Sequence, residues 1–246
     1  MTRFTPAVLI LLVANALVFV AGALLPGSQD NLIATGALWY PANEHFHAWQ
    51  LVTYMFLHGG VSHILFNMYA LFSFGVALES RWKTSRFLTF WFACGIGAGL
   101  VHLGVSVYQY HHYFDQLVAA GVAPDNIDLV LRTGGGHIPV GRGIESTLEK
   151  LYRIYAAPAL GASGAIYGVL VAFTFMYPNA RLALFFLPVP IAAKIFVPIV
   201  LAIDLLSGVT GFSIFGGGVA HFAHVGGALV GFVLMLFMRR QTAKPV

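Results

Sequence analysis

The chain has 246 residues, of which 59% are hydrophobic and only 9% are charged, and its mean hydropathy is +0.81. These values lie far outside the balance of a soluble domain and predict a single all-α, polytopic membrane domain over residues 1–246. The net charge of +4 does not indicate a nucleic-acid partner, because the basic residues stand between apolar runs and form no patch interleaved with aromatic side chains. We therefore expect the lipid bilayer, and no nucleic acid, around this chain.

Six apolar runs are long enough to cross a bilayer, at roughly 20 residues for each 30 Å crossing. The first follows Arg3 and is longer than the apolar core of a secretory signal, so we expect a retained helix. Bounded by charge, Pro and Gly, the six runs are predicted at about 6–25, 60–79, 87–108, 159–177, 182–206 and 219–238.

Basic residues mark one side of the membrane. They gather in 79–86, at Arg181 after the fourth run, and in a tail over 239–246. The positive-inside rule places these segments and both termini in the cytoplasm. The two long connections, about 26–59 and about 109–158, then lie outside, so the second, fourth and sixth runs all lead inward from the outer face.

The second long connection contains an amphipathic segment. Apolar residues recur at helical spacing between Ile144 and Tyr155, with Glu145, Glu149 and Arg153 among the polar residues between them. This pattern predicts a helix lying on the outer membrane surface.

Ser163 and His224 lie near the starts of the fourth and sixth runs, in the segments Gly161-Ala162-Ser163-Gly164 and His221-Phe222-Ala223-His224. Serine or histidine inside lipid is costly, so both indicate function. Serine becomes a nucleophile when a base takes its proton, and histidine is the usual base. At 1.5 Å per residue, both groups are expected on the order of 6–10 Å below the outer ends of their helices.

Small residues predict that these two helices approach closely. Gly164 and Gly168 recur four apart on the fourth run, and Gly227 and Gly231 recur four apart on the sixth. Tyr167, one turn after Ser163, is placed to pack against the imidazole and hold its ring.

The second run carries a further polar pair. His63 and Asn67 are four residues apart, so their tips share one helix face. Together with the backbone N–H of Ser163, they could bind an oxyanion during acyl transfer. His58 lies near the mouth of this region, where we expect a structural or solvent-related role.

The fifth run is interrupted by Pro188, Pro190 and Pro198, which favours a movable wall. Lys194 and Asp204 on this run are expected to be interfacial or paired, and not catalytic. With no carboxylate expected beside the histidine, a Ser–His dyad is favoured over a triad.

Other readings remain open at this point. Glycine-x-serine-glycine often serves helix packing alone, and a buried histidine often makes an interhelical hydrogen bond. A channel or transporter would also use intramembrane histidines, although the sequence has no inverted repeat. His45 and His47 beside Glu44 have metal-ligand spacing, but an interfacial loop accounts for them, and we expect no metal and no other cofactor. Convergence of all three motifs at one depth favours an enzyme.

The chain resembles the bacterial-type rhomboid intramembrane serine proteases of the six-helix form. The matching pieces are the Trp49 segment, His58, the His63–Asn67 motif, Gly161-x-Ser163-Gly164 with Tyr167, and Ala223-His224-x-x-Gly227-x-x-x-Gly231.

This resemblance implies a protease of the bacterial inner membrane that cleaves transmembrane segments of other proteins, with its site open to the external or periplasmic side. It implies Ser163 as the nucleophile and His224 as the base, with His63, Asn67 and the Ser163 amide binding the oxyanion. A non-catalytic binder of transmembrane helices is the alternative within the same fold. The oligomeric state is left open.

The resemblance also implies that the connection 26–59 lies partly embedded beside the helices. Gln50 follows Trp49 where many family members have arginine, which weakens the expectation of an arginine network there. Peptide hydrolysis needs water at Ser163, and the glycine-rich segment 207–218 suits a mobile cap, with Phe212 and Phe215 as plugs.

Overall fold

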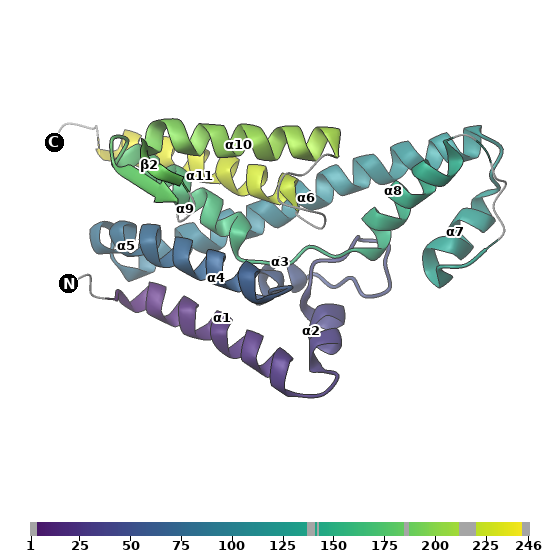
Figure 1. Ribbon diagram of the computed structural model, residues 1–246, viewed down its shortest axis with the longest axis horizontal. Coiled ribbons are helices and arrows are strands. Elements are labelled where there is room, and N and C mark those ends of the chain that lie inside the picture. Colours follow the sequence, from purple (N-terminus) through teal and green to yellow (C-terminus); the bar gives the residue numbers. More distant parts are fainter. Residues whose placement is uncertain (1–3, 137–140, 142, 185–186, 212–219, 243–246) are drawn as a thin grey trace.

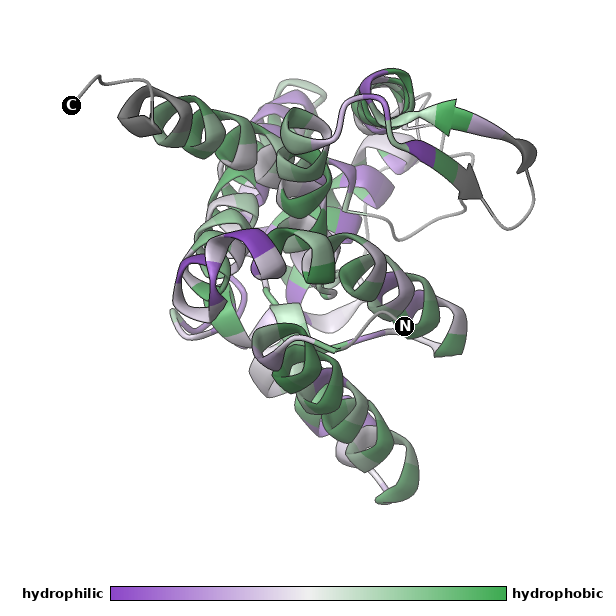
Figure 2. Ribbon diagram, turned by 90° about the vertical axis from the view of Figure 1, so that its left-hand side faces the viewer, coloured by the Kyte–Doolittle hydropathy of each residue, from purple (hydrophilic) through white to green (hydrophobic). Residues whose placement is uncertain are grey.

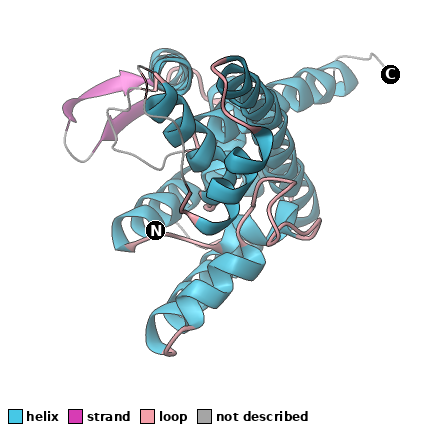
Figure 3. Ribbon diagram, turned by 90° about the vertical axis from the view of Figure 1, so that its right-hand side faces the viewer, coloured by secondary structure: helices cyan, strands magenta, loops and turns pink. Residues whose placement is uncertain are grey.

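The computed structural model is a helical bundle with one small hairpin at its edge (Figures 1 and 3). The structure describes residues 4–136, 141, 143–184, 187–211 and 220–242. The membrane body contains the helices α1 (Pro6–Leu24), α4 (Val61–Ala70), α5 (Val76–Trp82), α6 (Thr84–Ala119), α9 (Ser163–Met176), α10 (Ala193–Thr210) and α11 (His221–Thr242), with a π-helical turn, η2 (Leu71–Gly75), joining α4 to α5.

Shorter elements connect these helices. The first connection holds α2 (Ser28–Gly36), α3 (Gln50–Thr53) and the 3-10 turn η1 (Tyr54–Phe56). The second holds α7 (Pro124–Thr133) and α8 (Ile144–Ala156), and the hairpin β1 (Arg181–Leu184) and β2 (Leu187–Ala192) precedes α10.

The helical membrane fold predicted from the sequence is confirmed. Among the described residues, five helical segments are long and apolar enough to cross a membrane: α1, the α4–α5 segment, α6, α10 and the first part of α11. The sixth helix, α9, has only 14 residues. Nine of them are buried, because α9 packs against α6 and α11. Figure 2 shows apolar colour along much of the helical ribbon, and many large apolar side chains of the other helices are exposed, among them Leu17, Leu65 and Phe237, as expected for faces that contact lipid.

The start of α1 and the end of α11 lie at the same end of the bundle, as the predicted topology requires (Figure 1). Glu79 secures this end. Its carboxylate accepts hydrogen bonds from the backbone N–H groups of Ala7 (2.8 Å) and Val8 (2.9 Å) and from the Thr84 hydroxyl (2.8 Å). A negative charge at a helix N-terminus is favourable, so Glu79 caps α1 while joining the ends of two other spans.

The predicted fifth span, 182–206, is wrong over its first third. Residues 181–192 form the antiparallel hairpin, with Arg181 opposite Ala192, and the helix begins only at Ala193. Pro188 and Pro190 explain this difference, because proline lacks the N–H that a helix interior needs. Pro198 is tolerated inside α10.

The connection predicted at 109–158 is largely helical. Helix α6 continues to Ala119, well beyond the predicted end at 108, and α7 and α8 pack against it at a distance from the main bundle (Figure 1). Helix α8 confirms the amphipathic helix expected over 144–155. Its Leu151 and Tyr155 are buried against Leu117 and Ile127.

Gln50 forms the polar centre of the first connection. Its side chain is fully buried and donates to the carbonyl of His45 (2.6 Å) and that of Thr35 (3.3 Å). Its oxygen accepts from the backbone N–H groups of His47 (3.1 Å) and Trp39 (3.3 Å). An amide that both donates and accepts therefore holds this connection, where an arginine could only donate.

Candidate active site

The site lies where three helices begin. Ser163 is the first residue of α9, His224 the fourth of α11, and His63 the third of α4. The three motifs therefore share one layer, as predicted. Ser163 and His224 lie in the first turns of their helices and not 6–10 Å below the ends, because α9 and α11 begin four and two residues later than the predicted runs.

Ser163 and His224 are in direct contact. The distance from Ser163 Oγ to His224 Nε2 is 2.8 Å, a normal hydrogen bond. Tyr167 stacks on the imidazole with ring centroids 4.3 Å apart and planes 13° apart, which is the packing expected from the sequence. The imidazole is thus held on one face by an aromatic ring and at its edge by the serine.

Glycine allows the two helices to meet. A Cβ on Gly227 would overlap the carbonyl oxygen of Gly164, and a Cβ on Gly231 would lie 2.7 Å from the Cα of Gly168. At Gly227 and Gly231 the backbone of α9 therefore leaves no room for a side chain. The spacing of small residues predicted from the sequence is therefore what brings His224 to Ser163.

A carboxylate lies beside the histidine, contrary to the expectation from sequence. Asp204 on α10 is buried, with its side chain 1% exposed, and its Oδ1 lies 3.1 Å from His224 Nδ1 and 2.6 Å from His221 Nδ1. Its Oδ2 accepts a hydrogen bond from the Tyr167 hydroxyl. Asp204 is indeed paired, but its partners include His224 itself. The sequence signal for such a role is the acidic residue itself, because a carboxylate within an apolar span is costly in lipid unless it has a partner.

His63 and Ser163 border one small volume beside Gly161. A Cβ built on Gly161 would lie 2.7 Å from His63 Nε2 and 3.5 Å from Ser163 Oγ. The backbone N–H of Gly59 points at His63 Nδ1, 3.4 Å away, so Nε2 is the nitrogen that carries the proton and can donate. Gly161 has φ +125°, which L side chains rarely adopt, and the chain turns there into α9.

Asn67 and His58 complete this face. Asn67 is 7% exposed, and its Nδ2 has no hydrogen-bond partner among the described residues. An orphaned buried donor in this position suits a transient acceptor such as an oxyanion. His58 is buried with its ring edge against His63, centroids 5.0 Å apart, and burial together with His63 lowers the pKa of His58 to about 4. His58 is therefore a neutral packing partner at physiological pH.

Phe212 and Phe215, expected as plugs of the site, lie outside the described residues. Asp204, His221 and His224 offer three ligand atoms within 4.8 Å of one another. Their N-to-O separations of 2.6 and 3.1 Å are those of hydrogen bonds, and His224 is also engaged by the serine. These three side chains therefore form a hydrogen-bonded cluster that continues through His224 to Ser163.

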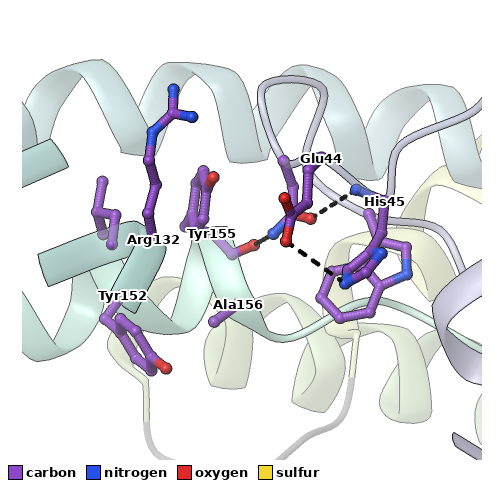
Figure 4. A pocket seen from close by; sticks show the side chains of 9 residues that line it. Glu44, His45, Arg132, Tyr152, Tyr155 and Ala156 are labelled. Atoms are coloured by element: carbon purple, nitrogen blue, oxygen red, sulfur yellow. Dashed lines mark hydrogen bonds and ion pairs between the residues drawn. The ribbon is translucent and has the colours of Figure 1, made fainter. Parts of the chain in front are cut away.

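A separate pocket lies between the first connection and α7–α8 (Figure 4). Its lining includes Glu44, His45 and Arg132, and two further lining residues are joined by a hydrogen bond from the Asn43 amide to the carbonyl of Tyr155 (2.8 Å). The residues lining it do not include Ser163 or His224.

The His45 and His47 rings contact different tryptophans. The His45 ring lies against Trp39, whereas His47 stacks on Trp49. These contacts are those of the interfacial loop expected from the sequence.

Fold and site together define a polytopic helical membrane protein with a serine–histidine pair inside its bundle. The family model for the Rhomboid domain matches residues 45–241, and the chain belongs to the rhomboid family.

Relatives come from several kingdoms. The chain is 28% identical over 222 residues to the mitochondrial presenilin-associated rhomboid-like protein of Mus musculus, and the aligned segment covers 90% of this chain and 45% of that protein. It is 23% identical over 189 residues to the mitochondrial Rhomboid protein 1 of Saccharomyces cerevisiae, covering 77% and 41%. It is 33% identical over 81 residues to the rhomboid protease GluP of Bacillus subtilis, covering 33% and 16%.

The chain thus spans less than half the length of these three relatives. Membrane-crossing helices make it an integral membrane protein. Because several relatives are mitochondrial, the predicted location in a bacterial inner membrane is not supported.

Proposed function

We propose that this protein is an intramembrane serine endopeptidase that cleaves transmembrane segments of other membrane proteins. The observation that carries the proposal is the 2.8 Å contact between Ser163 Oγ and His224 Nε2 inside a helical membrane bundle. Relatives named as proteases, in Toxoplasma gondii and Bacillus subtilis, support the same class of activity.

In the proposed reaction, His224 Nε2 takes the proton of Ser163 as Oγ attacks the scissile carbonyl. The negative charge on the carbonyl oxygen is received by His63 Nε2–H, the Asn67 amide and the backbone N–H of Ser163. This N–H is at the start of α9, where the first four N–H groups have no intrahelical partner and the helix dipole favours an anion. His224 then gives its proton to the leaving amine as the C–N bond breaks, which leaves the acyl group on Ser163 Oγ. Water next attacks this ester while His224 takes a proton from it, and His224 returns that proton to Oγ as the new carboxyl group leaves.

The membrane determines which substrates fit. A helical segment hides its carbonyls in intrahelical hydrogen bonds, so it must unwind before Ser163 can attack. We therefore propose single-span proteins with helix-destabilising Gly or Pro near the cut as substrates. The site lies at the end of the bundle away from the basic loops, and we propose that it opens to the non-cytoplasmic side.

Cleavage of a model single-span protein in liposomes tests the function. The wild-type protein should cut it, and Ser163→Ala and His224→Ala should each reduce cleavage by at least about 1,000-fold, because nucleophile and base act as one unit. Ser106→Ala, a buried serine of α6, is the matched control and should cut normally. Cleavage by Ser163→Ala at the wild-type rate would refute the proposal and leave a non-catalytic binder of transmembrane helices, or a channel or transporter, as the alternatives.

A further inference from the structure

We infer that Asp204 is a positioning residue that holds His224 in its basic tautomer, so that the proposed dyad works as a relay of Ser163, His224 and Asp204. The inference rests on the proposed function and adds to it a residue from a third helix, α10. Asp204 does not touch the reacting atoms, and it acts through the imidazole.

The Asp204 carboxylate is fully engaged by hydrogen-bond donors. Oδ1 contacts His224 Nδ1 and His221 Nδ1, and Oδ2 accepts from the Tyr167 hydroxyl. These donors come from α9 and α11, which flank the site. An ionised carboxylate buried in an apolar bundle is costly unless such donors satisfy it, so the three contacts explain how the charge is tolerated.

The contacts determine where the protons are. An ionised carboxylate accepts hydrogen bonds only, so Nδ1 of His224 must carry a proton. In a neutral imidazole the other nitrogen, Nε2, then has a free lone pair, and this is the atom 2.8 Å from Ser163 Oγ. The serine hydroxyl therefore donates to Nε2, which is the arrangement needed for proton transfer.

Charge adds to orientation. When His224 takes the serine proton it becomes an imidazolium, and the buried carboxylate at its other edge stabilises that cation. A neutral residue of the same shape would hold α10 against α11 equally well but would not stabilise the cation. This difference separates a positioning role from a purely structural one.

The two histidines bound by Asp204 have different roles. His221 and His224 have ring centroids 6.4 Å apart and are edge-on, and it is His224 that reaches Ser163. His221 is buried and has the shorter contact with Asp204. It keeps the carboxylate in place, while Tyr167 both stacks on His224 and donates to Asp204.

Asp204→Asn keeps the shape of the side chain and removes its charge. Its kcat for the model single-span substrate in liposomes should fall by about 100-fold or more, with KM within about twofold of the wild type, because the interaction stabilises the transition state and not the bound substrate. Lys194→Gln is the matched control, because it also replaces a charged group by an amide on α10, but at an exposed position ten residues before Asp204. It should retain wild-type kcat and KM.

A spectroscopic readout distinguishes positioning from anchoring. In ¹⁵N-histidine-labelled protein, with the His224 signals assigned by difference from His224→Gln, the wild type should show the Nδ1–H tautomer. Asp204→Asn should show an increased share of the Nε2–H tautomer. A normal kcat in Asp204→Asn would overturn the inference, as would a loss of activity with an unchanged tautomer and a lower unfolding temperature.

The inference and the proposed function fail in different ways. If wild type and Ser163→Ala have the same activity, the proposed function fails. If the wild type cleaves through Ser163 while Asp204→Asn keeps its full kcat, the function stands and the role of Asp204 is refuted.

Discussion

Gly227→Ala should uncouple the two helices that carry the site. The added Cβ would overlap the carbonyl oxygen of Gly164 and lie 2.7 Å from its carbonyl carbon and 3.3 Å from its Cα. Carbon atoms are in favourable contact at about 3.5–4.0 Å, so α9 and α11 must separate by roughly 1 Å. The obstacle is backbone, so no side-chain rotation can relieve it.

The magnitude follows from two opposing effects. Overpacking of this kind costs up to about 3 kcal/mol, and alanine recovers about 1 kcal/mol of helix propensity over glycine, which leaves a net loss of about 2 kcal/mol. For a chain of this size the loss corresponds to a decrease of roughly 4–8 °C in unfolding temperature. Because Gly164 follows Ser163 directly, a 1 Å shift should also reduce cleavage by about 100-fold.

The chain contains a built-in reporter for this measurement. Its one cysteine, Cys94, is fully buried in α6, so a thiol-reactive dye labels it only on unfolding. Gly104→Ala is the matched control, because a Cβ on Gly104 of α6 meets nothing within 4 Å, and it should be neutral or slightly stabilising. If Gly227→Ala were as stable and as active as Gly104→Ala, close glycine packing would not be what joins Ser163 to His224.

Two further predictions concern Gly161 and Glu79. Gly161→Ala should abolish cleavage for two reasons: φ +125° strains an L residue by about 1–3 kcal/mol, and the new Cβ would lie 2.7 Å from His63 Nε2. A normal cleavage rate would refute the oxyanion site proposed around His63. Glu79→Gln should lower the free energy of unfolding by about 1–2 kcal/mol in the Cys94 assay, because the backbone N–H groups of Ala7 and Val8 lose a charged acceptor. It should leave cleavage intact, because Glu79 lies 16 residues, about 24 Å, from His63 along the α4–α5 segment. An unchanged unfolding temperature would show that the cap of α1 contributes nothing.

Hydropathy predicted most of the membrane helices because lipid selects for long apolar runs. It failed at Pro188 and Pro190, where an apolar run forms a hairpin, because hydropathy reports burial and not hydrogen bonding. It located the third span, 87–108, inside α6 but did not predict that this helix continues to Ala119, because the residues after 108 are largely polar and aromatic.

The site was predictable where spacing along one helix determines contact. The glycines of the fourth and sixth runs, and Tyr167 one turn after Ser163, follow from helical periodicity. Sequence patterns alone do not place Asp204 in the site, because nothing along the fifth run identifies which groups on other helices it meets. Its cost in lipid predicted a partner, and only the packing of α10 against α9 and α11 identifies His224 as that partner.

Covalent labelling of Ser163 tests the central claim most directly. A serine-directed fluorophosphonate applied to the wild-type protein in detergent, followed by peptide mass mapping, should modify Ser163, and His224→Ala should label at least about 100-fold more slowly because Ser163 loses its base. Ser106 serves as the internal control and should stay unmodified. Failure of Ser163 to label, or equal labelling with and without His224, would contradict the assignment of a serine nucleophile activated by histidine.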